Sequence, residues 1–169
     1  MLILYISATV LALFLAACAM VLSFKANEIK KRRHFLNEAL WARRHLIPLL
    51  IESGDTNKDV QDAKKEIIKL RAAASKGAAL QEQIGIEKQM SHYIRELLHK
   101  IEADRILMAD AQFLSVKKEY VHALEQIDIA INDFNFEVQE FSKYIRFPWF
   151  RIFVFLFKVR FFKSLQNVE

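Results

Sequence analysis

A run of 23 residues without a charged side chain, from Leu2 to Phe24, constrains the fold of this chain more than any other feature. A helix of that length covers about 34 Å, enough to cross the roughly 30 Å hydrocarbon core of a bilayer. A cleavable signal peptide has a basic stretch before a shorter apolar one, and here no Lys or Arg precedes the run. The run therefore predicts a single retained transmembrane anchor over residues 1–24. Its anchor residues include Leu4, Leu11, Phe14, Leu15 and Leu22.

Basic side chains follow this run, with five of them between Lys25 and Arg33. By the positive-inside rule they place the N-terminus outside and the rest of the chain in the cytoplasm, which in a bacterial protein means an anchor in the inner membrane. One alternative stays open, because the segment from Leu15 to Cys18 resembles the lipobox of bacterial lipoproteins. Lipidation of Cys18 would turn the protein into a periplasm-facing lipoprotein. The missing basic N-terminal stretch and the apolar residues up to Phe24 favour the transmembrane anchor.

The rest of the chain predicts an all-α fold. Three Gly and two Pro in 169 residues are too few for the turns of an all-β fold, and 53% hydrophobic residues argue against disorder. Apolar residues recur with alternating spacings of four and three, which is the heptad pattern of packed helices. The three series are Val60, Ala63, Ile67, Leu70 and Ala74; Met90, Ile94, Leu97 and Ile101; and Tyr120, Leu124, Ile127, Ile131, Phe134, Val138, Phe141 and Ile145. They predict an antiparallel bundle of long helices over residues 25–146.

Turn-forming residues divide this bundle. Breaks are predicted at 53–57, at 75–77 and, from pattern alone, at 104–109. Asp110 is a suitable N-cap for a last helix that would run to about Arg146. Pro48 is predicted to kink or end the first helix, because it lacks a backbone donor and clashes with the preceding turn.

Residues 147–169 form a third, aromatic and basic segment. From Phe147 to Lys163 it has seven of the fourteen Phe residues and four basic residues, Lys163 included, and no acidic residue. Each Arg or Lys near a bilayer centre costs about 2.5–3.5 kcal/mol, so the segment is not expected to span the membrane. It is predicted to lie at the membrane surface; capping of the bundle, an oligomer contact and a membrane hairpin are the alternatives. The interface residues are Trp149, Phe150, Arg151, Phe157, Lys158, Phe161, Phe162 and Lys163.

Catalytic patterns are weak in this sequence. The three Gly residues are too far apart for a phosphate-binding loop, and no H-E-x-x-H motif is present. Two Glu-x-x-His pairs, Glu96 with His99 and Glu119 with His122, could hold a di-iron centre on facing helices. The heptad frame places both histidines away from the core, so a di-metal enzyme is the least favoured alternative. We expect no enzyme activity, cofactor or metal.

Several motifs resemble the LemA family of bacterial membrane proteins. Residues 43–50 resemble the family pattern R-R-x-D-L-I-P-x-L, with His45 where Asp is usual, and 69–72 resemble an Ala-Arg motif. Residues 127–148 resemble I-x-x-A-R-x-x-Y-N-x-x-V-x-x-Y-N ending in F-P, with Ile131 in place of Arg and Ser142 in place of the second Asn. The motif residues are Arg43, Leu46, Ile47, Pro48, Arg71, Asn135, Val138, Phe147 and Pro148.

The resemblance implies an antiparallel helical bundle on one N-terminal membrane helix, with no established enzymatic activity. Combined with the heptad series, it leads to a non-enzymatic scaffold or adaptor that binds protein partners or copies of itself. Both basic clusters adjoin apolar stretches, so a lipid membrane, and not nucleic acid, is the other expected partner.

Overall fold

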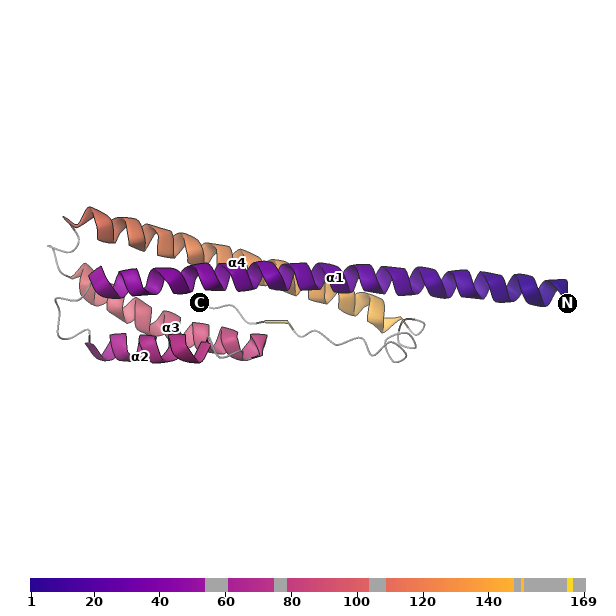
Figure 1. Cartoon of the computed structure of the whole chain (residues 1–169), viewed down its shortest axis with the longest axis horizontal. Coiled ribbons are helices and arrows are strands. Elements are labelled where there is room, and N and C mark those ends of the chain that lie inside the picture. Colours follow the sequence, from indigo (N-terminus) through magenta and orange to yellow (C-terminus); the bar gives the residue numbers. More distant parts are fainter. Residues whose placement is uncertain (54–60, 75–78, 104–108, 148–149, 151–163, 166–169) are drawn as a thin grey trace. The chain divides into compact units, whose positions relative to one another are not determined.

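The uncharged run and the basic segment after it form one helix in the computed structural model, α1 (Leu2–Ser53). The structure describes residues 1–53, 61–74, 79–103, 109–147, 150 and 164–165, apart from the side chain of Leu4. Figure 1 shows α1 as one unbroken ribbon, and its bounds include both Phe24 and Lys25, so the anchor and the first bundle helix are parts of one element. By length and composition, α1 is able to cross a membrane.

Pro48 lies inside α1, which continues to Ser53. Of the two outcomes predicted for this proline, a kink or the end of the helix, the second is therefore wrong. A proline within a helix costs about 3 kcal/mol or more through one lost hydrogen bond and a clash with the preceding turn. Burial of Ile47 and Leu50, which are at most 1% exposed on either side of it, offsets this cost.

Three further helices follow in the described part of the chain: α2 (Gln61–Ala74), α3 (Leu80–Glu102) and α4 (Ala111–Arg146). The three predicted breaks lie between these helices, and most of their residues fall outside the described part of the chain. The Asp110 carboxylate accepts a hydrogen bond from the backbone N–H of Gln112 at 2.9 Å, which confirms Asp110 as the N-cap of α4. Arg146 ends α4, as predicted.

The helices divide into two compact units. We call Met1–His34 with Asn132–Ser164 the anchor unit, and Phe35–Ile131 with Leu165–Glu169 the bundle unit. The core of the bundle unit is apolar and draws on all four helices, and α2 lies along α3. Its buried members are Ile47, Leu50, Ile67, Met90, Ile94, Leu97, Ile101, Phe113 and Tyr120. The all-α bundle is thereby confirmed, and its core uses the predicted seams.

The anchor unit continues the same pattern. Phe134, Val138 and Phe141 of α4 are buried, as are Ile29 and Leu22 of α1. Two ion pairs connect these helices: Arg32 Nη1 lies 2.8 Å from Asp133 Oδ2, and Lys25 Nζ lies 3.5 Å from Glu137 Oε2. In this unit the two helices therefore run antiparallel along a shared seam.

Most of the predicted anchor residues lie in the described part of the chain, whereas most of the predicted interface residues do not. Leu11, Phe14 and Leu15 are exposed on α1, whereas Leu22 is buried. Of the predicted interface residues, Phe150 is described and half-buried, with its ring 6.1 Å from that of Tyr144. The others lie outside the described residues: Trp149, Arg151, Phe157, Lys158, Phe161, Phe162 and Lys163.

Candidate functional site

A charged side chain with no solvent exposure lies at the centre of the bundle unit. The buried series on α1 runs Leu36, Leu40, Arg43, Ile47 and Leu50, in the alternating four-three spacing of a seam. Arg43 therefore occupies a core position, and its side chain is 0% exposed. A buried guanidinium needs a counter-charge and hydrogen-bond acceptors from neighbouring helices.

Glu87 of α3 supplies that counter-charge and is also 0% exposed. Its Oε2 accepts a hydrogen bond from Arg43 Nη1 at 2.9 Å, and its Oε1 accepts one from Arg44 Nε at 2.5 Å. Arg44 is 15% exposed at its side chain. The Glu87 carboxylate therefore balances the charge of the fully buried Arg43 and also holds the side chain of Arg44 against α3.

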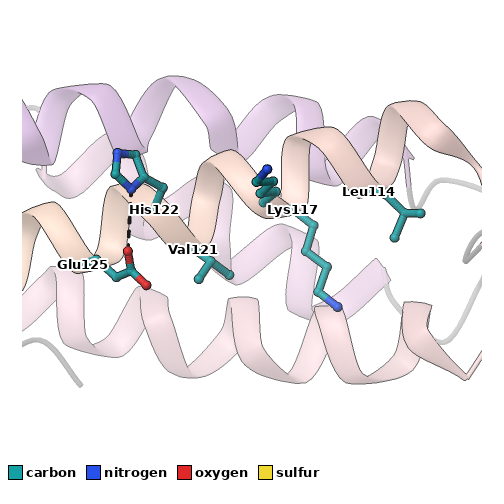
Figure 2. A pocket seen from close by; sticks show the side chains of 6 residues that line it. Leu114, Lys117, Val121, His122 and Glu125 are labelled. Atoms are coloured by element: carbon teal, nitrogen blue, oxygen red, sulfur yellow. Dashed lines mark ion pairs between the residues drawn. The ribbon is translucent and has the colours of Figure 1, made fainter.

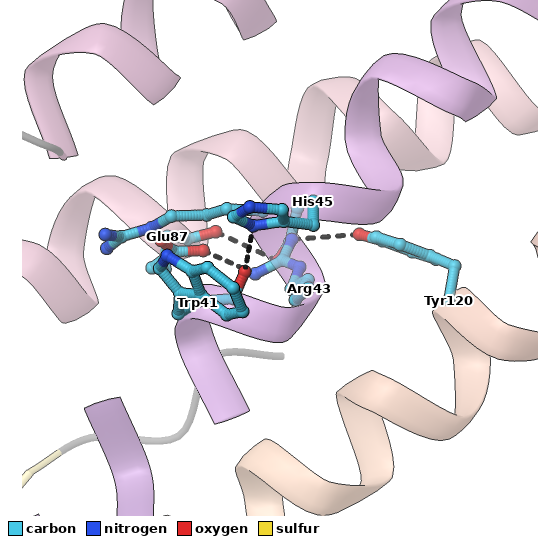
Figure 3. Close-up of polar contacts among 7 residues, drawn as sticks. Trp41, Arg43, His45, Glu87 and Tyr120 are labelled. Carbon is cyan, nitrogen blue, oxygen red and sulfur yellow. Dashed lines mark hydrogen bonds and ion pairs between the residues drawn. The ribbon is translucent and has the colours of Figure 1, made fainter. Parts of the chain in front are cut away.

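Two hydroxyl groups complete the network (Figure 3). Arg43 Nη2 donates to Ser91 Oγ at 2.7 Å and to Tyr120 Oη at 2.9 Å, and Ser91 Oγ donates to the Glu87 carbonyl at 3.0 Å. The Arg43 guanidinium also lies 5.4 Å from the centre of the Tyr120 ring. The network thus ties α1 to α3 and α4 within the bundle unit.

Burial raises the pKa of Tyr120, and the positive charge of Arg43 works in the opposite direction. Tyr120 is therefore a neutral phenol at physiological pH, with an oxygen that accepts from Arg43. Two donors of this cluster, Arg43 Nε and Arg44 Nη2, are buried and have no hydrogen-bond partner among the described residues. Each such orphan costs about 1–3 kcal/mol, so the network is held by the surrounding packing.

A small recess of about 100 Å³ between α3 and α4 reaches this network from outside. Its lining includes Ser91 and Tyr120 together with Arg95 and Asp128. A water molecule occupies about 30 Å³ of liquid, so the recess has room for a few waters and is too small for an organic substrate.

The outer face of α4 carries a shallow groove of about 440 Å³ (Figure 2). Leu114 and Val121 line it between Lys117, Lys118 and His122. His122 Nδ1 lies 3.6 Å from Glu125, and both side chains are about two-thirds exposed. The groove holds no buried polar group, so it has the character of an open helix face.

The histidines of the two Glu-x-x-His pairs are exposed, as the heptad frame predicted. His92 is also exposed and pairs with Glu96 at 3.7 Å. Within the described ranges, no group of three or more His, Cys, Asp or Glu side chains is arranged to hold a metal ion. The candidate di-iron ligands thus gain no support from their geometry.

A second exposed feature lies on α1. Trp41, His45 and Leu49 follow one another at a spacing of four residues and form one stripe, which we call the Trp41 face. Trp41 is 62% exposed and Leu49 is 43% exposed, and the Trp41 and His45 rings lie 3.8 Å apart (Figure 3).

A family model of the LemA family matches residues 27–167 of this sequence. The chain belongs to the LemA family. Membership agrees with the helical fold and suggests a membrane-associated helical protein. A comparison with curated proteins gives no match.

The motif residues of this LemA protein are divided between the two units. Arg43, Leu46, Ile47 and Pro48 lie within six residues of α1 in the bundle unit, which also contains the half-buried Arg71 on α2. Asn135, Val138 and Phe147 belong to the anchor unit, and Pro148 lies outside the described residues. Of the set, Arg43 is the residue with a buried polar role.

Glu87, Ser91 and Tyr120 were not identified as network residues from the sequence, although Tyr120 was placed in the seam of α4. A signal was available for Glu87. The seam of Ile101, Leu97, Ile94 and Met90 reaches Glu87 at its next step toward the N-terminus. A carboxylate at an apolar seam position indicates a buried ion pair.

Proposed function

We propose that this protein is a non-enzymatic scaffold, anchored by α1 in the bacterial inner membrane, whose bundle binds a protein partner or a second copy of the chain. The Trp41 face is the observation that carries this proposal. Tryptophan is among the residues that contribute most to protein interfaces, and a ring that is 62% exposed leaves most of its apolar area in water.

The buried polar groups of the bundle unit support a structural and not a catalytic role. The Arg43 guanidinium and the Glu87 carboxylate hydrogen-bond to each other and to neighbouring side chains, in a setting without solvent exposure. A catalytic acid or base needs a cleft where it can reach a substrate. The small recess beside Tyr120 does not provide one.

Site-specific photocrosslinking in intact cells tests the scaffold. A benzoylphenylalanine at His45, next to Trp41, should form protein adducts, and a Trp41→Ala change in the same protein should reduce them several-fold. The same crosslinker at Lys118, an exposed position on α4, is the matched control. Mass spectrometry of the adduct separates a second copy from another protein. Adducts at position 45 no stronger than at position 118 would overturn the proposal.

The proposed orientation, with the N-terminus outside and the bundle in the cytoplasm, is supported by the basic residues that follow Phe24. On a Cys18→Ser background, a single cysteine at Lys118 should react with a membrane-impermeant maleimide only after lysis. Labelling before lysis, with the outer barrier permeable, would favour the periplasm-facing lipoprotein. Incorporation of labelled palmitate that is lost in Cys18→Ser would establish that alternative.

A further inference from the structure

We infer that the C-terminal end of α4 is a second membrane contact, in which Phe147 enters the acyl-chain region of a bilayer and Arg146 meets anionic phospholipid headgroups. This inference rests on the proposed anchorage by α1, because the position of the uncharged run of α1 defines where the membrane boundary lies. It concerns residues Tyr144–Phe147 and Phe150, all of which belong to the anchor unit.

The register between α1 and α4 in the anchor unit carries the argument. Arg32 pairs with Asp133, and Lys25 pairs with Glu137 and lies 6.0 Å from the centre of the Tyr144 ring. Both helices rise about 1.5 Å per residue and run antiparallel. Counting along each helix from these three contacts places Phe147 opposite the segment 15–22 of α1.

That segment lies inside the uncharged run, which ends at Phe24. The run is about 34 Å long as a helix and the hydrocarbon core is roughly 30 Å thick, so the cytoplasmic boundary falls within about three residues of Phe24. Phe147, opposite the middle of segment 15–22, is then roughly 4–8 Å below that boundary. This is the depth at which interfacial helices insert their apolar side chains.

Burial in the anchor unit agrees with this register. Cys18 and Leu22 are each 5% exposed, whereas Leu15, Met20 and Val21 beside them are at least 40% exposed. The side chains of the N-terminal half of the run are thus exposed on all sides of the helix. In its last two turns, one side of the helix is buried. This pattern agrees with a register in which α4 overlaps the last turns of the run.

The side chains at the end of α4 suit an interface. Phe147 is 60% exposed, an unfavourable state for a phenyl ring in water. A hydrogen bond from Lys143 lowers the pKa of Glu140, so these two residues form an ion pair within α4. Arg146, next to Phe147, is an exposed cation. An aromatic ring beside an arginine matches acyl chains below anionic headgroups.

Spin-label depth measurements on the full chain test this inference, in vesicles of phosphatidylcholine with phosphatidylglycerol. Single labels are placed on a Cys18→Ser background at Phe147 and at Phe136, which is also on α4, in the same unit and 60% exposed. Phe136 is eleven residues further from the membrane, about 16 Å. The ratio of oxygen to nickel-chelate accessibility should be several-fold higher at 147 than at 136.

A label at Phe14, in the middle of the apolar run, separates the two hypotheses. Deep burial at 14 with equal ratios at 147 and 136 would overturn the α4 contact and leave the anchorage intact. A label at 147 that neither reagent reaches would also overturn it, because protein would then cover the ring. Aqueous accessibility at all three positions would overturn the anchorage and the contact together. Arg146→Gln should reduce the depth at 147 in anionic vesicles and leave it unchanged in neutral ones.

Discussion

Each of the two units contains an ion pair between α1 and another helix, but the two pairs differ in solvent exposure. In both, a basic residue on the buried side of α1 pairs with an acidic residue of another helix. In the bundle unit Arg43 and Glu87 are both 0% exposed, whereas in the anchor unit Arg32 and Asp133 are 42% and 44% exposed. A buried pair is costly to break because the remaining charge stays out of water, whereas water screens an exposed pair. Equal geometry therefore does not mean equal energy.

The largest effect is expected from breaking the buried pair. Glu87→Gln removes the carboxylate that pairs with Arg43 in the described part of the chain. It should lower the free energy of unfolding by about 3–5 kcal/mol, since it leaves a buried charge unpaired. Thermal and urea unfolding of the detergent-solubilised protein measures this loss. Hydrogen exchange should accelerate in residues 79–103 more than in 132–146.

A double variant is the control for this prediction. Arg43→Met with Glu87→Leu removes both charges at similar volume and should restore most of the lost stability, because apolar replacements of buried ion pairs are often neutral or stabilising. Arg44, which is 15% exposed, can then turn toward solvent. A double variant as unstable as Glu87→Gln alone would show that the loss is one of packing.

An intermediate effect is expected at Tyr120. Tyr120→Phe removes the oxygen that accepts from Arg43 and should cost about 1.5–3 kcal/mol, the range for hydrogen bonds to charged groups. Because burial raises the pKa of Tyr120 above the ordinary value of 10.0, its contribution is fully present below pH 10.0 and is lost as the pH rises through the folded-state pKa.

Two measurements check this pH dependence. The ultraviolet titration of tyrosinate should show a step above the ordinary tyrosine pKa of 10.0, and Tyr120→Phe should remove that step. The stability of the unchanged protein should fall above pH 10.0 more steeply than that of Tyr120→Phe. Parallel curves for the two proteins would contradict the assignment.

The smallest effect is expected from the exposed pair of the anchor unit. Arg32→Ala should cost less than about 1 kcal/mol, because both partners remain accessible to water when the pair is lost. The difference from the unchanged protein should shrink as salt is raised to about 1 M, where charges are screened beyond roughly 3 Å. If Arg32→Ala lowered the free energy of unfolding as much as Glu87→Gln, independently of salt, the two ion pairs would not differ in energy as proposed.

Much of the helical fold was predictable, and the reason is periodicity. The seam from Tyr120 to Phe141 is buried apart from the half-buried Leu124, and Asp110 caps its helix as its side-chain chemistry suggests. Such signals are local, because they depend on residues within one helix. The polar site was only partly predictable. Arg43 was identified through the family resemblance, and its partner Glu87 lies 44 residues away on another helix.

Pro48 shows the limit of a local rule. Its lost hydrogen bond and its clash are properties of one helix, but the apolar contacts of Ile47 and Leu50 belong to the packed bundle and outweigh them.

The sequence by itself determined where the helices lie, which side of each is apolar and that the first run is able to cross a membrane. Only the tertiary structure decided that Arg43 is fully buried while Arg32 is partly exposed. Burial and pairing of a charge depend on neighbours distant in sequence, and no periodicity within one helix encodes them.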